Sequence, residues 1–284
     1  MDEPMSNHTT FRVGGPADLM LFPASVEELS CVLQFLNDAH VPVYVMGNGS
    51  NLLVRDGGIR GAVIKLADNF NHVSVDGTRL RAQAGISLAR LAHRALQASL
   101  AGLEFASGIP GTLGGAVAMN AGAYGSEMAD VIVHATCCDF HGNMYYLNLE
   151  ELELGYRTSR VRSQGYIALE VILQLEQGDQ AAIRTKMDEL NQRRRQKQPL
   201  AFASAGSTFK RPPGYYAGTL IEEAGLRGVG IGHAEVSELH CGFIINRGGA
   251  TAAQVLKLIE LVQQRVWDKF RVKLELEVQV VGED

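Results

Sequence analysis

The sequence predicts an α+β fold in two parts, with a boundary near residue 178. Before this boundary, short strand patterns are joined into hairpins by turns such as Asp76-Gly77 and His141–Asn143. After it, helical patterns over 180–197 and 251–266 dominate. Local strand pairing together with separate helices is typical of the α+β class.

The first part, 1–178, is expected to contain more strands than helices. Ser25 and Glu28 match a capping box, and the apolar residues after them recur at helical spacing as far as Leu36. A second helix is expected over 87–100, ended by Gly102. We place a division into two subdomains near 67–70. The expected strands are 17–22, 41–45, 63–66, 73–75, 80–82, 131–138, 144–147 and 166–175.

The second part, 179–284, begins with the helix over 180–197, which Pro199 stops. A short helix over 219–225 and a strand over 242–246 follow, and Thr251 caps the next helix. The chain ends in a long alternating strand. Its expected inward residues are Val272, Leu274, Leu276, Val278 and Val280.

Composition sets broad limits on the class of protein. With 46% hydrophobic and 20% charged residues among 284, the chain can bury a proper core. A net charge of −5 argues against a nucleic-acid partner, and no apolar run approaches the roughly 20 residues of a membrane span. The polar N-terminus does not resemble a secretory signal, and the four cysteines have no CxxC spacing. We therefore expect a cytoplasmic protein with reduced thiols and no metal site.

The stretch Phe105–Gly125 holds six glycines and almost no charge. Glycine costs about 1 kcal/mol at each interior helix position, so we expect an ordered loop there and not a helix. Glycine also lets the backbone come close to a ligand, and successive N–H groups in such a loop bind phosphate. A tight turn inside an apolar core is the other interpretation of the same pattern.

A second glycine loop, Gly47–Asn51, follows the strand pattern at 41–45. A strand followed by GxG suggests a dinucleotide-binding βαβ unit, and Asp68 lies near the distance expected for the ribose carboxylate. However, Leu52 stands where the third glycine belongs, and the next residues read as strand, turn and strand. We therefore expect this loop to bind phosphate through backbone N–H groups between two strands.

Few side chains suggest chemistry by pattern alone. Arg157 reads as a solvated loop arginine, Ser207 as a turn residue and Glu277 as an exposed strand carboxylate. The basic run that contains Arg193, Arg194, Arg195 and Lys197 can simply complement a helix dipole. The motifs HExxH, GxSxG and GxxxxGK[ST] do not occur, so the common hydrolase and nucleotide-phosphatase motifs are absent.

Five segments favour a functional interpretation of these residues. They occur in one order and together closely resemble the UDP-N-acetylenolpyruvoylglucosamine reductase family of peptidoglycan synthesis. They are GNGSNLLVRDGGIRG (47–61), SGIPGTLGGAVAMNAGAYG (107–125), LGYRTSR (154–160), AGSTFKRPPG (205–214) and LELEV (274–278). The resemblance extends from about residue 7 to the C-terminus. About 35 residues separate Arg157 from the arginine cluster, which resembles the shorter (type II) class of the family.

The resemblance implies an FAD-binding fold of the vanillyl-alcohol-oxidase (PCMH) type, followed by a smaller α+β substrate-binding domain. It also implies non-covalent FAD, with NADPH as the hydride-donor co-substrate. The implied cofactor-binding residues are Gly47, Asn48, Gly49, Ser50, Asn51, Leu52, Gly108, Ile109, Pro110, Gly111, Gly114, Gly115, Asn120 and Ala123.

The implied reaction reduces the enolpyruvyl group of UDP-N-acetylglucosamine enolpyruvate and gives UDP-N-acetylmuramate. Arg157 matches the family arginine that stabilises negative charge developing on the substrate carboxylate, a task that suits a planar, permanently charged fork. Glu277 matches a glutamate that assists there, and a raised pKa would avoid repulsion. Ser207 matches the serine that donates a proton to the adjacent carbon. The implied substrate-binding residues are Lys197, Lys210 and Arg211.

Two alternatives stay open on the sequence. One is another flavoprotein oxidoreductase of the same fold, such as an oxidase of a hydroxy acid or sugar. These enzymes often tether flavin to a histidine, and neither glycine loop here contains one. The other is a flavin-free regulator that binds a sugar nucleotide. The sequence also leaves open the oligomeric state and the choice between NADPH and NADH.

Overall fold

The computed structural model describes residues 1–284, and contacts divide the chain into two compact units. The terminal unit comprises Met1–Leu19, Gly49–Gly61 and Arg195–Asp284. The central unit comprises Met20–Asn48 and Ala62–Arg194.

These units differ from the sequence-based domains 1–178 and 179–284 because of where apolar side chains are buried. Ile183 and Met187 pack in the core of the central unit, although they follow residue 178. Phe11 and Leu53 pack in the core of the terminal unit. The predicted boundary between an FAD-binding and a substrate-binding domain stays a prediction, since the compact units are defined by contacts and not by what each part binds.

The central unit is built on a five-stranded antiparallel sheet in the order β12-β11-β13-β7-β6. Its strands are β6 (Val73–Asp76), β7 (Arg79–Gln83), β11 (Ile132–Cys138), β12 (Met144–Asn148) and β13 (Ile167–Gln174). Both predicted hairpins are confirmed. In the first, Asp76 pairs with Arg79, and Gly77 takes the positive φ of 57° that the two-residue turn requires.

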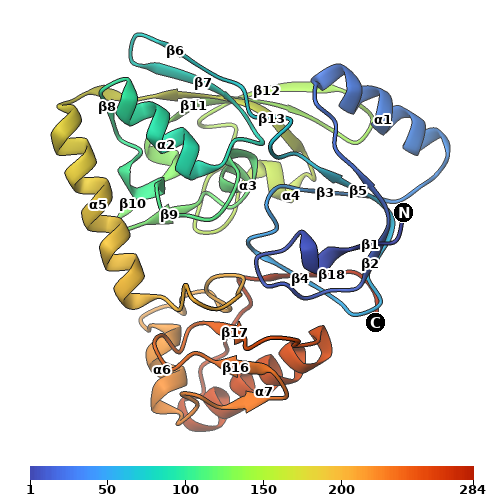
Figure 1. Cartoon of the computed structure of the whole chain (residues 1–284), viewed down its shortest axis with the longest axis vertical. Helices are drawn as coiled ribbons and strands as arrows, with labels where there is room; N and C mark the ends of the chain where they lie inside the picture. The colour runs from blue at the N-terminus through green and yellow to red at the C-terminus, as the bar shows by residue number, and fades with distance from the viewer. The chain divides into compact units, whose positions relative to one another are not determined.

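Helices cover this sheet and close its core (Figure 1). Apolar residues of α2 and α3, such as Leu91 and Val117, pack with sheet residues such as Val171. The helices of the unit are α1 (Val26–Asp38), α2 (Leu88–Gln97), α3 (Leu113–Ala118), α4 (Arg160–Ser163) and most of α5 (Gln180–Lys197). Ser25 caps α1 as predicted, but the Glu28 carboxylate accepts from the N–H of Ala24 at 2.7 Å, so the capping box is incomplete.

Helix α3 corrects one expectation, because it lies inside the glycine-rich stretch that was predicted to be non-helical. Thr112 caps it by accepting from the N–H of Gly115, and its buried face carries Leu113, Ala116 and Val117. A Cβ on Gly114 would lie 2.9 Å from the Cβ of Ala84. Close packing against the sheet therefore outweighs the low helix propensity of glycine.

The second glycine loop lies between two strands, as predicted, with no helix after it. Strand β3 (Val43–Met46) ends before the loop and β4 (Leu52–Val54) begins at its end. The chain then continues in β5 (Ile59–Lys65), which like β2 (Pro16–Leu21) has residues in both units. The remaining short elements are β1 (Glu3–Pro4), η1 (Met5–Asn7), β8 (Leu100–Ala101), η2 (Glu104–Ala106), β9 (Gly122–Ala123), β10 (Ser126–Glu127), η3 (Met128–Asp130) and β14 (Glu176–Gln177).

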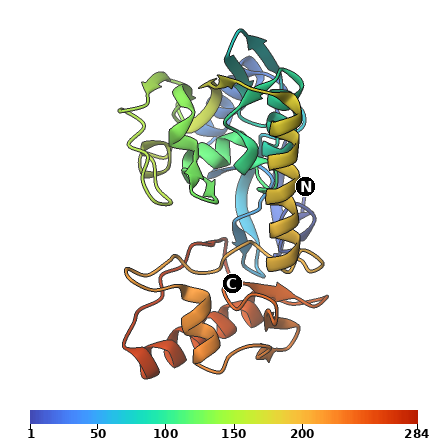
Figure 2. The same ribbon diagram turned by 90° about the vertical axis from the view of Figure 1, so that its left-hand side faces the viewer.

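In the terminal unit, two helices accompany a three-stranded sheet in the order β15-β16-β17. This part of the chain is orange to red in Figure 2. The elements are α6 (Ala217–Glu223), β15 (Gly230–Ile231), β16 (Ala234–Val236), β17 (Ile244–Asn246) and α7 (Ala252–Phe270). The predicted capping box at Thr251 is present. The carboxylate of Asp56 also accepts from the N–H groups of Ala252 and Ala253, at 2.7 and 2.9 Å.

The long final strand was predicted wrongly in its extent. Only β18 (Gln279–Val281) is a strand, parallel to β4, and a single bridge pairs Phe209 with Leu276 before it. The alternation itself is partly confirmed, since Leu274 and Val278 are buried. The segment before β18 stays extended because it pairs with an irregular loop.

No helix of the structure is long and apolar enough to cross a membrane. The four cysteines are free, and no group of three or more His, Cys, Asp or Glu is placed to hold a metal ion. Burial raises the pKa of Cys137 to about 12 and that of Cys138 to about 11, so both thiols stay protonated at neutral pH.

Candidate active site

The two glycine loops meet at Gly47. A Cβ at this position would lie only 2.1 Å from the Oγ1 of Thr112, the residue that caps α3. Glycine is therefore required for the close approach of the two segments. Among the predicted cofactor-binding residues, all but Gly49, Leu52 and Asn120 keep partly exposed surface.

Helix α5 supports the glycine-rich stretch from one side. Asn191 donates to the Oγ of Ser107 at 3.2 Å, and the hydroxyl of Tyr124 donates to the carbonyl of Leu190 at 3.2 Å. A Cβ on Gly108 would lie 2.5 Å from the Oδ1 of Asn191 and 3.1 Å from the Cδ of Arg194. Burial lowers the pKa of the Arg194 guanidinium, which lies against this loop.

Asn120 has a different place from the other predicted cofactor residues. It has 0% exposed surface and a φ of 41°. Its amide donates to the carbonyl of Gly155 at 3.2 Å, and its Oδ1 accepts from the N–H of Ala129 at 3.0 Å. We therefore assign Asn120 a supporting role inside the loop in place of a ligand contact.

Arg157 lies at the tip of a very tight turn in the central unit. Gly155 and Thr158 exchange backbone hydrogen bonds of 3.1 and 3.2 Å, which leaves only Tyr156 and Arg157 between them. Arg157 has a φ of 57°, in the left-handed region that few residues with side chains adopt. Its guanidinium carbon lies 5.0 Å from the centroid of the Tyr156 ring.

Ser207 and Glu277 come together in the terminal unit, although they are far apart in the sequence. The N–H of Glu277 donates to the carbonyl of Thr208 at 2.9 Å, and the N–H of Lys210 donates to the carbonyl of Glu275 at 2.8 Å. This pairing places Glu277 opposite Thr208, so Ser207 lies one residue from the position that faces Glu277. The Ser207 hydroxyl is half-buried and forms no hydrogen bond within the protein.

The end of the second glycine loop joins this pair. The amide of Asn51 donates to the carbonyl of Glu277 at 3.0 Å, and the carbonyl of Asn51 accepts from the N–H of Gln279 at 2.9 Å. A predicted cofactor residue is thus bonded to the backbone of a predicted catalytic residue.

Thr10 is a contributor that sequence reasoning missed. Its N–H donates to the carbonyl of Gly49 at 3.2 Å, and its hydroxyl donates to the carbonyl of Ser204 at 2.7 Å. It therefore ties the glycine loop to the segment that leads to Ser207. No motif signalled this threonine, because the bond depends on contacts with two distant segments.

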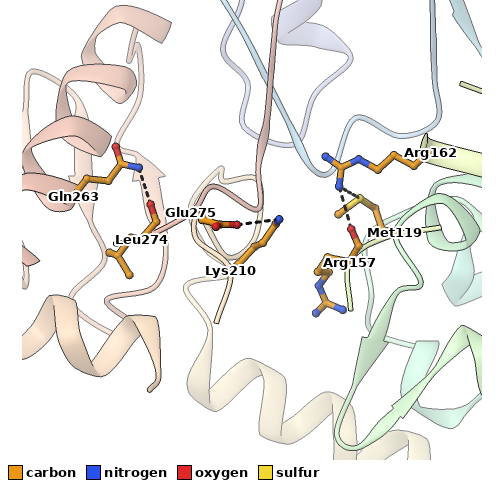
Figure 3. A network of polar contacts seen from close by, with 7 residues as sticks. All are labelled: Met119, Arg157, Arg162, Lys210, Gln263, Leu274 and Glu275. Carbon is orange, nitrogen blue, oxygen red and sulfur yellow. Dashed lines mark hydrogen bonds and ion pairs between the residues drawn. The ribbon is translucent and has the colours of Figure 1, made fainter. Parts of the chain in front are cut away.

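The predicted substrate-binding residues are exposed or half-buried in the terminal unit. Lys197 ends α5. The Nζ of Lys210 lies 3.4 Å from the Oε2 of Glu275 (Figure 3). The guanidinium of Arg211 lies 4.0 Å from the centroid of the Tyr216 ring. Lys210 and Arg211 follow Ser207 in the same segment, whereas Lys197 precedes it by ten residues.

The basic run on α5 is spread around the helix. Arg193 pairs with Glu189 at 3.2 Å, as neighbouring residues on a helix surface do. Arg194 lies against Gly108, whereas Arg195 lines a pocket of the terminal unit with a volume of about 300 Å³. The run therefore does not act as one cluster.

The exposed backbone of these loops fits a flavin nucleotide. Gly115 is exposed, and a Cβ there would meet only the Oγ1 of Thr112, at 3.6 Å. A backbone surface without side chains is what a large planar and phosphate-bearing group needs for close approach.

Comparison with known proteins decides the family. Residues 198–281 match the family model of the UDP-N-acetylenolpyruvoylglucosamine reductase C-terminal domain, and residues 17–148 match an FAD binding domain. The UDP-N-acetylenolpyruvoylglucosamine reductase of Alkaliphilus oremlandii is 53% identical over 284 residues, which is 100% of this chain and 93% of the relative. The chain belongs to the UDP-N-acetylenolpyruvoylglucosamine reductase family.

Further relatives agree with this assignment. The enzyme of Clostridioides difficile is 52% identical, again over 100% of this chain and 93% of the relative. The crystal structure of the Thermus caldophilus reductase superposes with a TM-score of 0.84 at 38% identity, covering 98% of this chain and 97% of that one. The expected fold is confirmed as an FAD-binding domain followed by a smaller α+β domain. The chain is thus an FAD-dependent oxidoreductase of peptidoglycan synthesis.

Proposed function

We propose that the enzyme uses NADPH to reduce the enolpyruvyl group of UDP-N-acetylglucosamine enolpyruvate, and that Arg157, Ser207 and Glu277 act on this substrate. The observation that carries the proposal is the hydrogen bond from Asn51 to the Glu277 carbonyl. It joins the end of the glycine loop to the segment of Glu277, so Asn51, which is expected to bind flavin, lies in the same compact unit as Ser207 and Glu277.

Backbone groups of the two glycine loops, 47–52 and 108–115, would hold the flavin. When bound, it would supply the hydride transfer that links NADPH to the vinyl carbon of the substrate. The loops exclude side chains from this surface, as the exposed Gly115 illustrates.

Arg157 stabilises the charge that develops on the substrate. As hydride adds to the terminal carbon of the double bond, negative charge moves onto the substrate carboxylate. A guanidinium stays positive at any relevant pH and matches a carboxylate in shape. The tight turn fixes its backbone before the reaction, which avoids reorganisation at the transition state.

Ser207 donates the proton that completes the reduction. The carbon next to the carboxylate takes the hydroxyl proton, and solvent restores it to the serine. The hydroxyl is available because it has no hydrogen-bond partner within the protein. Glu277 lies at the neighbouring position and assists the charge redistribution, while Lys197, Lys210 and Arg211 bind the diphosphate of the substrate.

We place the reaction in the cytoplasm. Support comes from the requirement for NADPH and from four cysteines that form no disulfide.

The proposal is tested by following flavin absorbance under anaerobic conditions. NADPH should bleach the flavin, and the enolpyruvyl sugar nucleotide should restore its colour with stoichiometric formation of UDP-N-acetylmuramate. UDP-N-acetylglucosamine, which lacks the double bond, is the matched control and should not reoxidise the flavin. If the enolpyruvyl substrate fails to reoxidise the flavin and only admitted oxygen does so, the protein has another flavoprotein activity. A colourless purified protein would indicate a regulator without flavin.

A further inference from the structure

The turn that carries Arg157 needs external support. Arg157 has a φ of 57° at a position where glycine or asparagine is the usual residue. A residue with a long side chain persists there only when its surroundings hold the backbone in place. The residue that supplies this support controls where the guanidinium points.

Arg162, on the short helix α4, makes the relevant contact. Its Nη1 donates to the carbonyl of Arg157 at 3.0 Å and lies 3.5 Å from the Sδ of Met119 (Figure 3). Met119 ends the helical part of the glycine-rich stretch. One guanidinium nitrogen therefore joins the strained turn to the loop that is predicted to bind flavin.

The charge of Arg162 is directed at this carbonyl, because Arg162 forms no ion pair with an acidic residue. A hydrogen bond from a charged donor is about twice as strong as a neutral one. The Arg162 charge also acts on the half-buried Tyr44, whose pKa desolvation raises to about 12. Arg162 is an exposed residue, and the two contacts of its Nη1 are to neutral groups.

We propose that Arg162 is the positioning residue for Arg157: it fixes the left-handed turn so that the Arg157 guanidinium is held ready for the substrate carboxylate. This inference rests on the proposed role of Arg157. Arg162 acts through the backbone of Arg157 and touches neither substrate nor flavin in this role.

The test separates the two half-reactions by stopped-flow absorbance. Arg162→Ala should keep its flavin and be reduced by NADPH at the wild-type rate. Its reoxidation by saturating enolpyruvyl substrate should slow by roughly tenfold to a hundredfold, the usual effect of a misplaced catalytic group. Arg162→Met, which keeps the packing against Met119 and lacks only the donor, should slow as much. Arg162→Lys, which can still donate to the carbonyl, should recover most of the rate.

Arg160→Ala is the matched control. It removes the same charge from the same helix, and the Arg160 guanidinium forms no hydrogen bond or ion pair. It should therefore reoxidise like the wild type. If the reoxidation rate of Arg160→Ala fell as much as that of Arg162→Ala, the proposal would be overturned, because the loss would then be a general effect of positive charge on an anionic substrate.

A double-mutant cycle tests whether Arg162 acts through Arg157. The variant with both Arg157→Ala and Arg162→Ala should react within about twofold of Arg157→Ala alone, because the coupled effect is already lost. Additive losses, or wild-type reoxidation in Arg162→Met, would overturn the inference. If Arg162→Ala does not fold, the Met and Lys variants decide the question. The proposed function is tested separately with the wild-type enzyme. It is wrong if the enolpyruvyl substrate does not reoxidise the reduced flavin of the wild type.

Discussion

The turn around Arg157 and the segments around Ser207 and Glu277 are secured in different ways. Two backbone hydrogen bonds close the turn, and side chains anchor it to its surroundings: Asn120 donates to the Gly155 carbonyl and Arg162 to the Arg157 carbonyl. The Ser207 region is anchored mainly by backbone hydrogen bonds that pair 208–210 with 275–278, with one added side-chain bond from Asn51 to the Glu277 carbonyl. Backbone pairing survives most substitutions, whereas a bond from a side chain is lost when that side chain is removed.

The comparison teaches where mutations should act. Around the turn, residues that never touch substrate should change the reaction by moving Arg157. Around Ser207, a substitution should remove only the chemistry of the substituted side chain. Each prediction below tests one side of this contrast.

The largest effect is expected for Ser207→Ala. The change removes one oxygen from a half-buried side chain without a hydrogen bond, so the paired backbone should stay in place. NADPH reduction should be nearly unchanged, and reoxidation by the enolpyruvyl substrate should slow by about a hundredfold to ten-thousandfold, the usual contribution of a positioned acid. Stopped-flow flavin absorbance measures both steps.

Ser204→Ala provides a control in the same segment, because only its backbone carbonyl is used in the structure, by Thr10. It should retain both half-reactions. Equal slowing of both half-reactions in Ser207→Ala would indicate a displaced flavin, and unchanged reoxidation would mean that Ser207 is only a turn residue.

The other side of the contrast predicts a loss of stability for Asn120→Ala. This change leaves the Ala129 N–H without its partner beside a residue with 0% exposed surface, and it removes one of the two hydrogen bonds that the Gly155 carbonyl accepts. It also puts alanine at a φ of 41°. We expect the free energy of unfolding to fall by about 2–4 kcal/mol, since an unsatisfied buried donor costs about 1–3 kcal/mol and a left-handed backbone costs alanine about 1–2 kcal/mol. Urea denaturation of the flavin-loaded protein measures the change.

Asn148→Ala is the matched control for Asn120→Ala. Asn148 is exposed, and its Oδ1 accepts from the N–H of Glu151 at 2.9 Å. It should cost about 1 kcal/mol or less, as surface hydrogen bonds do. If Asn120→Ala is equally mild, the turn does not depend on buried side-chain support.

Local patterns predicted the parts of the fold that local forces decide. The Asp76-Gly77 turn specifies its hairpin, and Thr251 with its capping partner specifies the start of α7. Helix α3 was missed because its stability comes from packing of Gly114 against Ala84, which no local propensity records. The final strand was overextended for the same reason, since its pairing depends on the distant loop at 208–210.

The candidate site divides in a similar way. The glycine loops could be predicted from their composition, but Ser207, Glu277 and Arg157 were identified only by family resemblance. Arg162 had no signal at all, because it is one of three arginines within six residues and only the shape of the turn selects it. Residues that support others through long-range contacts are the ones that sequence patterns leave undetected.

A smaller effect is expected on flavin binding for Gly115→Val. Helix α3 supports the Arg157 turn, since the Ala118 carbonyl accepts from Ser159 at 2.8 Å. Gly115 is exposed, and a Cβ there would meet only the Thr112 Oγ1, at an ordinary contact distance of 3.6 Å. Stability should hold, while the flavin dissociation constant should rise by roughly tenfold, about 1.4 kcal/mol.

Gly115→Ala should lie between the wild type and the valine variant, which makes a graded series. Fluorescence quenching on flavin binding gives the dissociation constants. An unchanged constant in the valine variant would mean that flavin does not contact this surface and that α3 serves the turn alone.

The smallest effect is expected for the basic residues beside Ser207. Lys210→Ala leaves its backbone bonded to the Glu275 carbonyl at 2.8 Å, so only the charge is lost. A contact with the substrate diphosphate that is the same in the ground and transition states changes KM and not kcat. We expect KM for the sugar nucleotide to rise by roughly threefold to tenfold, with flavin content unchanged.

Arg211→Ala should raise KM less, because its guanidinium is already stacked on Tyr216. Glu275→Gln, which releases Lys210 from its ion pair, should leave KM equal or lower. Steady-state kinetics of the three variants measure KM and kcat. A fall in kcat for Lys210→Ala would show that this backbone-paired region is as sensitive to indirect support as the Arg157 turn. A normal KM in both alanine variants would mean that neither residue binds the substrate.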